Sequence, residues 1–390
     1  MPSRLEKRDN GEDSEVALPG FPTFPRSCRS LLAQTLTRSM YASLLPTRTG
    51  HGATLPDCIA EGVRFPDHPI GVLAADSECY PLFWALFEPI IARLHPLYSA
   101  DPSWTHPQDL NLGNLRLEEI QTGAARILSV RLSVARNLLG YPMPPIMAKN
   151  HRLEVRAIVF DALRQLEHGV VGATLMLEDM EETRWQGESR REARDNGVLN
   201  TPNPRTAAGH QSRERLSGRG VFVSKSEARS LCVWANAGGD HLRVTCTEDI
   251  RHHYCRHRQG ERGEGGVVGE APISSAVSAV LTSLGEVLEG LADQGGLRFD
   301  WSPQLGYVTC SPSELGTAMT ASFLVVLQRA PWCPGFDRVC MALGVEEEQE
   351  GGEWDGVFVV SNRWTLGVSE VETIQNLLEG VARLLEVDNK

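Results

Sequence analysis

Apolar residues recur at helical spacing at both ends of this 390-residue chain. Between residues 31 and 97 they crowd several helical faces, as in helices that pack together within a small helical domain. Over residues 275–294 they repeat at intervals of three and four, which predicts an amphipathic helix. A last helix is predicted after Ser369, because Ser369 and Glu372 form a capping-box pair and the apolar residues that follow share one face.

Strand patterns are concentrated in the C-terminal part of the chain. Residues 127–134 alternate apolar and polar side chains, which indicates a strand, and residues 152–168 are predicted as a helix. Four further segments are predicted as strands: 231–237, 242–247, 322–328 and 356–362. Together these patterns predict an α+β fold, in which a small all-helical N-terminal domain precedes a larger α/β domain with a mainly antiparallel sheet flanked by helices.

Polar stretches rich in Pro, Gly and Asn set the expected domain boundaries. We expect a disordered tail over residues 1–28, a helical domain over 29–105, a linker over 106–122 and a C-terminal domain over 123–390. Two polar inserts in the second domain, at about 184–218 and 251–271, are predicted to be flexible.

Composition narrows the possible partners and the compartment. The net charge of −12 argues against nucleic acid or an anionic membrane as the main partner. Nine scattered cysteines favour a reducing compartment over a disulfide framework. The N-terminus is charged where a signal peptide needs an apolar stretch, and no apolar run approaches the roughly 18 residues of a membrane span. We therefore expect a cytoplasmic protein with no membrane partner.

One loop between two predicted strands carries candidate chemistry. In residues 234–245, WANAGGDHLRVT, the side chains of Asp240, His241 and Arg243 lie beside two glycines, Gly238 and Gly239. A second cluster of metal-ligand types, His252, His253, Cys255 and His257, has no partner cluster at zinc-finger spacing. We interpret this second cluster as a solvated basic loop and expect no metal site, although a metal-binding role is a further alternative.

Eight segments, in a fixed order, resemble the ATP:guanidino phosphotransferases, the family of the arginine and creatine kinases. The segments are 53–63, 74–91, 112–115, 128–142, 217–223, 233–244, 305–317 and 356–372. They include LSVRLSVARNLLGYP, VWANAGGDHLRV and GVFVVSNRWTLGVSEVE, and the N-terminal segments are closer to arginine kinases. The resemblance implies a guanidino kinase-like fold that binds Mg-ATP or Mg-ADP and a small guanidino molecule between its two domains.

The resemblance also implies roles for individual residues. It assigns nucleotide binding to Ser129, Arg131, Ser133 and Arg243, with Ser133 standing where the family has a second phosphate arginine. It assigns the substrate-binding segments to His68, Pro69, Ile70, Leu73, Cys310 and Ser311. Ser311 aligns with the family's reactive cysteine, and strand alternation predicts that Cys310 is a buried thiol facing the other way.

Several matched positions lack the family's chemistry. Gly238 and Gly239 fall where the family has its catalytic glutamate, which leaves no confident catalytic residue and only Asp240 as a weak candidate base. Further family side chains are replaced: a histidine by Val223, an arginine by Thr320, and an arginine near Gly344 by an acidic stretch that we expect to be a loop. Each lost charge-stabilising donor costs about 10²- to 10³-fold in rate.

These losses predict a family member with lost or strongly reduced phosphotransfer that is kept for binding or for pairing. The expected partner is either a second copy, in a homodimer, or an active relative, in a heterodimer. The main alternative is an active guanidino kinase with an altered substrate, in which Asp240 or Glu314 acts as the base. A protein-arginine kinase is a third hypothesis, and it faces the same missing arginines.

Overall fold

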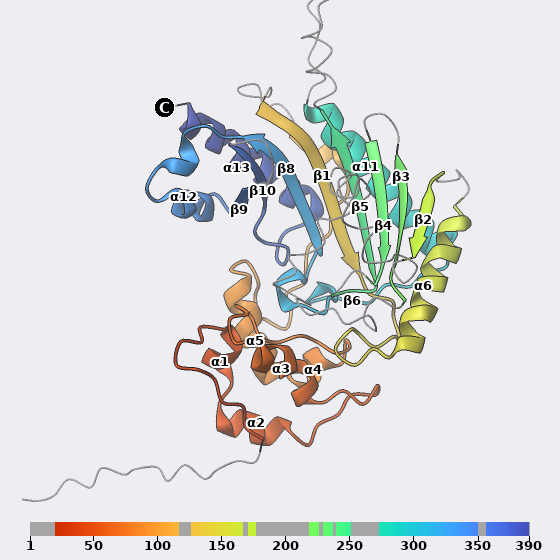
Figure 1. Ribbon diagram of the computed structural model, residues 1–390, viewed down its shortest axis with the longest axis vertical. Helices are drawn as coiled ribbons and strands as arrows, with labels where there is room; N and C mark the ends of the chain where they lie inside the picture. The colour runs from red at the N-terminus through yellow and green to blue at the C-terminus, as the bar shows by residue number, and fades with distance from the viewer. Residues whose placement is uncertain are drawn as a thin grey trace, which may run out of the picture.

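The computed structural model describes residues 20–116, 126–166, 171–176, 218–225, 229–236, 239–250, 273–349 and 356–389. A small helical domain, built from the N-terminal part of the chain, lies against one end of a larger domain with a sheet (Figure 1). The predicted α+β fold with two domains of this kind is confirmed. Residues 1–19, nearly all of the 184–218 insert and the 251–271 insert lie outside the described residues.

The N-terminal domain consists of short helices around one apolar core. Its helices are α1 (Leu31–Thr35), α2 (Arg38–Leu44), α3 (Leu55–Arg64), α4 (Cys79–Leu82) and α5 (Trp84–Leu94). Helix α3 begins at a capping box, in which Asp57 Oδ2 accepts the backbone N–H of Thr54 at 2.8 Å. The core beneath these helices includes the fully buried side chains of Phe83 and Phe87.

The domain begins earlier in the chain than its composition predicts. Residues 20–28, expected to belong to a disordered tail, pack against the N-terminal helices instead. Phe21 and Phe24 lie against the core of the domain, and the Tyr41 hydroxyl donates a hydrogen bond to the Gly20 carbonyl at 2.8 Å. Two aromatic side chains in this otherwise polar stretch bury enough apolar surface to hold it in place.

The C-terminal domain is built on an eight-stranded antiparallel sheet with the order β2-β3-β4-β5-β1-β8-β10-β9. The strands are β1 (Ile127–Arg136), β2 (Ala173–Met176), β3 (Gly220–Lys225), β4 (Arg229–Ala235), β5 (Leu242–Asp249), β8 (Met319–Val326), β9 (Val345–Gln349) and β10 (Val357–Asn362). A short hairpin, β6 (Trp301–Ser302) and β7 (Gly306–Tyr307), lies near the other domain.

The acidic stretch after Gly344 is a strand and not the expected loop. Residues Val345–Gln349 form β9, which pairs with β10 at the edge of the sheet. Backbone hydrogen bonds to β10 stabilise this strand, while its glutamates remain largely exposed. Charged side chains are common on edge strands because they discourage pairing with other chains.

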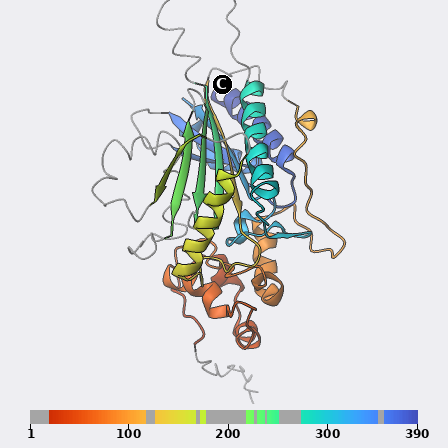
Figure 2. The same ribbon diagram turned by 90° about the vertical axis from the view of Figure 1, so that its right-hand side faces the viewer.

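Two long helices cover one face of the sheet and leave the other for the site. Helices α11 (Ile273–Asp293) and α13 (Glu370–Asp388) lie on the same side of the strands, as the turned view shows (Figure 2). Helix α6 (Lys149–Arg164) crosses the end of the sheet near β2 and β3, and α12 (Phe336–Ala342) lies beside β9. Helix α11 is long and apolar enough to span a membrane, but its apolar face packs against β1 and β5.

Strand alternation in β1 separates the core from the site. Val130, Leu132 and Val134 belong to the apolar core of the domain. Ser129, Arg131 and Ser133 alternate with them and therefore face the opposite side. The face of the sheet without α11 and α13 thus carries polar residues near its centre.

Candidate functional site

A pocket of about 440 Å³ lies between the two domains. From the N-terminal domain it is lined by Asp57, Glu61, His68, Pro69, Ile70 and Leu73, among others. From the C-terminal domain its lining includes Arg152, Arg219, Asn236, Gly239, Asp240, Arg243, Cys310, Ser311, Ser313 and Glu314. The cavity thus brings together Arg243 and all six residues that the resemblance assigns to the substrate segments. The other three residues assigned to nucleotide binding, Ser129, Arg131 and Ser133, do not line it.

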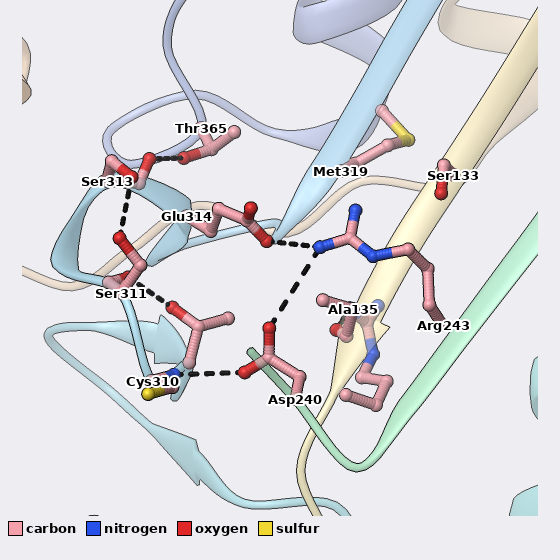
Figure 3. A network of polar contacts seen from close by, with 12 residues as sticks. Ser133, Ala135, Asp240, Arg243, Cys310, Ser311, Ser313, Glu314, Met319 and Thr365 are labelled. Carbon is pink, nitrogen blue, oxygen red and sulfur yellow. Dashed lines mark hydrogen bonds and ion pairs between the residues drawn. The ribbon is translucent and has the colours of Figure 1, made fainter. Parts of the chain in front are cut away.

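The centre of the pocket wall is an ion-pair network around Arg243 (Figure 3). Arg243 Nη2 donates to Glu314 Oε2 at 2.6 Å and lies 4.0 Å from Asp240 Oδ2. The Arg243 side chain is only 12% exposed and that of Asp240 only 3%. The pocket therefore holds this arginine between two carboxylates of the same chain.

Asp240 is held by hydrogen bonds to two other segments. Its Oδ1 accepts from Asn137 Nδ2 at 2.7 Å and from the backbone N–H of Cys310 at 2.9 Å. Burial raises the pKa of Asp240 to about 6, and the nearby charge of Glu314 adds to the rise, while Arg243 opposes it. A carboxyl group with this pKa is in the range of a general base, but most of its acceptor capacity is already used.

Tertiary packing also fixes the neighbouring histidine of the loop. His241 Nδ1 accepts the backbone N–H of Leu138 at 3.0 Å, and its Nε2 donates to the Pro142 carbonyl at 3.0 Å. Burial lowers the pKa of His241 to about 4, so the ring is neutral at pH 7. His241 therefore has a structural role beside the pocket.

The four predicted nucleotide residues lie on two paired strands. Ala135 of β1 pairs with Arg243 of β5. Farther along the same two strands, Ser133 pairs with Thr245 and Arg131 pairs with Thr247. The Ser133 hydroxyl is 2.8 Å from the hydroxyl of Thr245, and Arg131 Nε donates to Thr247 Oγ1 at 3.4 Å. Ser129 shares this face by alternation. The face is polar, but at Ser133 it has a hydroxyl where the resemblance expects a cation.

Another arginine at the end of β1, Arg136, is buried and bound inside the protein. Arg136 is 4% exposed, and its guanidinium carbon stacks 3.3 Å from the centre of the Tyr307 ring. Its Nη1 donates to the carbonyl oxygens of Ala135 and Thr317. It does not line the pocket.

The substrate loop from the N-terminal domain is held by its own hydrogen bonds. His68 Nδ1 accepts the backbone N–H groups of Ile70 at 3.2 Å and Gly71 at 3.0 Å. Leu73 donates its N–H to the Cys58 carbonyl at 2.9 Å. These bonds shape the loop that forms one wall of the pocket.

Cys310 joins the two domains, and Ser311 lines the pocket beside it. The backbone N–H of Ala74 donates to the Cys310 carbonyl at 2.7 Å, and the Cys310 side chain packs in the N-terminal core. Burial raises the pKa of the Cys310 thiol well above its usual range, and the nearby charges of Asp240 and Glu61 contribute. The thiol is therefore protonated and not poised as a nucleophile.

Some predicted positions do not join the pocket. Val223 belongs to a small apolar cluster on β3 and β4, and Thr320 stands opposite Ser133 across β1 and β8. Gly238 and the His and Cys cluster at residues 252–257 lie outside the described residues. Within the described parts of the chain, no group of three or more His, Cys, Asp or Glu could hold a metal ion.

Two pocket residues carry no signal that marks them in the sequence. Glu61 and Arg152 lie in ordinary helical segments, and only the approach of the two domains brings them to one cavity. Glu314 is visible in the sequence as a candidate base, but its contact with Arg243, 71 positions away, is a product of the fold.

Comparisons with known proteins agree with this architecture. Residues 26–92 match the family model "ATP:guanido phosphotransferase, N-terminal domain", and residues 273–390 match its "C-terminal catalytic domain". Human creatine kinase M-type is 30% identical over 92% of this chain and 88% of that protein. Arginine kinase of Anthopleura japonica is 30% identical over 92% of this chain, and flagellar creatine kinase of Strongylocentrotus purpuratus is 29% identical over 97%. The matches span only 46% and 30% of these two longer relatives.

A solved structure of lombricine kinase superposes with a TM-score of 0.73 at 25% identity, covering 93% of this chain and 92% of that one. The two-domain fold is thus shared with a solved kinase structure. More specifically, the chain belongs to the ATP:guanido phosphotransferase family, the phosphagen kinases.

Proposed function

We propose that this protein is a phosphagen kinase family member that binds ligand between its domains but has lost, or retains only weakly, the transfer of phosphoryl groups. One observation carries the proposal: Arg243, the pocket arginine that the resemblance assigns to nucleotide binding, is already neutralised, because Glu314 holds it at 2.6 Å and Asp240 lies 4.0 Å away. A phosphate group would have to compete with these carboxylates for the guanidinium.

Magnitudes support this proposal. Removing one preorganised donor from a catalytic site costs about 10²- to 10³-fold in rate. Gly239, where the resemblance places a glutamate, lines the pocket without a side chain. Ser133 and Thr320 take two arginine positions, and together the changes leave little of the charge that phosphoryl transfer needs.

The family is one of ATP-dependent kinases, which use Mg-ATP. For this chain we propose that Mg-ADP or Mg-ATP still binds on the polar face around Arg131, with low affinity. A small guanidino compound and a second subunit, identical or an active relative, are the proposed partners. A cytoplasmic location agrees with free thiols throughout the described residues.

The alternative is an active guanidino kinase with rearranged groups, and one observation favours it. Asp240 lies in the pocket with a pKa of about 6, which is suitable for a general base near neutral pH. In that case Asp240→Asn would abolish a measurable activity, whereas under our proposal there is little activity to lose.

Two measurements on the purified full chain test the proposal. Calorimetry with Mg-ADP, in the presence and absence of guanidino compounds, reports binding. A coupled assay with arginine, creatine, taurocyamine and agmatine as acceptors reports phosphoryl transfer, with an active arginine kinase as the positive control. Turnover above about 1 s⁻¹, the lower end of kinase rates, would overturn the proposed loss of activity.

A further inference from the structure

On the basis of the ligand-binding role proposed above, we propose that the pocket selects a guanidino compound with a second positive charge, a guanidino-amine, over a guanidino acid. The pocket wall offers acceptors that have no partner among the described residues, while several of its donors are already engaged. This imbalance defines the chemistry of the ligand, because buried polar groups need complementary partners.

Among the described residues, Glu61 is the main pocket acceptor without a partner. It lies in α3, lines the pocket and is half-buried. Its carboxylate has neither a hydrogen bond nor an ion pair with any described residue. One turn earlier on the same helix, Asp57 uses only its Oδ2 for the Thr54 cap, so that its Oδ1 is also available. A cationic group would satisfy both carboxylates at once.

Asn236 adds an independent acceptor on the opposite wall. Its side chain is 5% exposed, and its Nδ2 donates to the carbonyl oxygens of Arg152 and Gly218. Its Oδ1 is buried and, within the described parts of the chain, has no hydrogen-bond partner. Asn236 lines the same pocket as Glu61, and an N–H donor on the ligand would complete its hydrogen bonding.

The loop that faces the ligand offers few donors for a carboxylate. The N–H groups of Ile70 and Gly71 both donate to His68 Nδ1, and Pro69 has no N–H. Because His68 Nδ1 accepts both of these bonds, it offers no N–H to a ligand carboxylate.

The pocket arginines are also partly engaged within the protein, although the buried Nε of Arg243 has no hydrogen-bond partner among the described residues. Arg243 is held by Glu314, and Arg152 Nη1 donates to the Met147 carbonyl at 2.7 Å. Arg219 also interacts within the chain. A ligand carboxylate would therefore displace existing contacts and meet the charges of Asp57 and Glu61, whereas an ammonium group would meet open acceptors.

The test compares three ligands of equal chain length by calorimetry: agmatine, butylguanidine and the corresponding guanidino acid. We expect agmatine to bind about tenfold more tightly than butylguanidine, since a hydrogen bond to a charged group has about this effect. The guanidino acid should bind most weakly. Glu61→Gln should remove the preference for agmatine, and Glu289→Gln, the same change at an exposed site on α11 outside the pocket, should preserve it.

The outcomes separate this inference from the proposed function. Tighter binding of the guanidino acid than of agmatine would overturn the selectivity and leave the ligand-binding role intact. An agmatine preference unchanged in Glu61→Gln would also overturn the inference, since Glu61 is its main acceptor. Failure of all three compounds to bind the wild-type protein would overturn both. The comparison of ligands on the wild-type chain needs no variant to fold.

Discussion

Glu314→Gln is the substitution that most directly tests how the pocket controls its own arginine. The exchange keeps the size of the side chain and a hydrogen-bond acceptor near Arg243, but it removes the negative charge 2.6 Å from the guanidinium. Asp240 then remains at 4.0 Å as the only carboxylate beside Arg243 within the described residues. Arg243 becomes available to an anion on the polar face of the sheet.

The expected gain follows from these contacts. A hydrogen bond between charged groups contributes about 1.5–3 kcal/mol, and the remaining Asp240 retains part of the arginine's charge. We therefore expect Mg-ADP to bind about tenfold more tightly, which corresponds to about 1.4 kcal/mol. The loss of stability should be small, about 1 kcal/mol, because the Glu314 side chain is 30% exposed and glutamine still accepts a hydrogen bond.

Calorimetry with Mg-ADP at constant ionic strength measures this effect, since weak ion pairs depend on salt. Glu61→Gln is the matched control, because it removes the same charge from the same pocket. Glu61 forms no ion pair with Arg243, so we expect Mg-ADP affinity to change by less than about twofold. Equal gains in the two variants would show that only the net charge of the pocket matters. No gain in Glu314→Gln would refute the conclusion that Glu314 restrains Arg243.

Three further predictions follow from buried groups and close contacts. Burial lowers the pKa of His95 and His241 to about 4, so their contribution to stability is complete above pH 6.5 and falls as pH drops toward 4. The free energy of unfolding should fall by about 3 kcal/mol per histidine at most, as measured by urea unfolding at several pH values. A free energy of unfolding that does not change between pH 7 and pH 4 would contradict this prediction. Gly62→Ala should lower the free energy of unfolding by about 1–3 kcal/mol, because the added Cβ would lie 2.1 Å from a backbone carbonyl oxygen. Gly285→Ala, whose Cβ would lie in open space on α11, is the control and should not destabilise the protein. Gly239→Glu should fold normally, since nothing lies within 4 Å of a Cβ built at this position. A gain in phosphoryl transfer in the coupled assay would show that the missing carboxylate limits the rate. Aggregation or unfolding of the variant would show that the site has no room for the side chain.

Local sequence patterns determine much of the fold. The period of apolar residues predicts a helix over 275–294, and the structure places α11 at Ile273–Asp293. The capping box at Ser369 predicts the start of α13, and its two reciprocal hydrogen bonds are present. These features depend on residues within one or two turns of each other, so the sequence contains all the information they need.

Other elements depend on partners that the local sequence does not contain. Edge strand β9 is a run of glutamates with no strand pattern, and it forms because β10 offers backbone groups to pair with. Residues 20–28 are polar by composition, yet Phe21 and Phe24 find a core to pack on. In both places tertiary contacts outweigh local propensity.

By itself, the sequence determined the family, the two-domain organisation and the absence of a glutamate and several arginines from their family positions. Only the tertiary structure decided that Arg243 is held by Glu314, that the loop amides are bound by His68, and that Glu61 faces the same cavity from the other domain. The physical reason is the separation in sequence of the residues that interact. Helical period and capping depend on near neighbours in the sequence. The charge balance of a pocket depends on which distant side chains the fold brings within a few ångströms of each other.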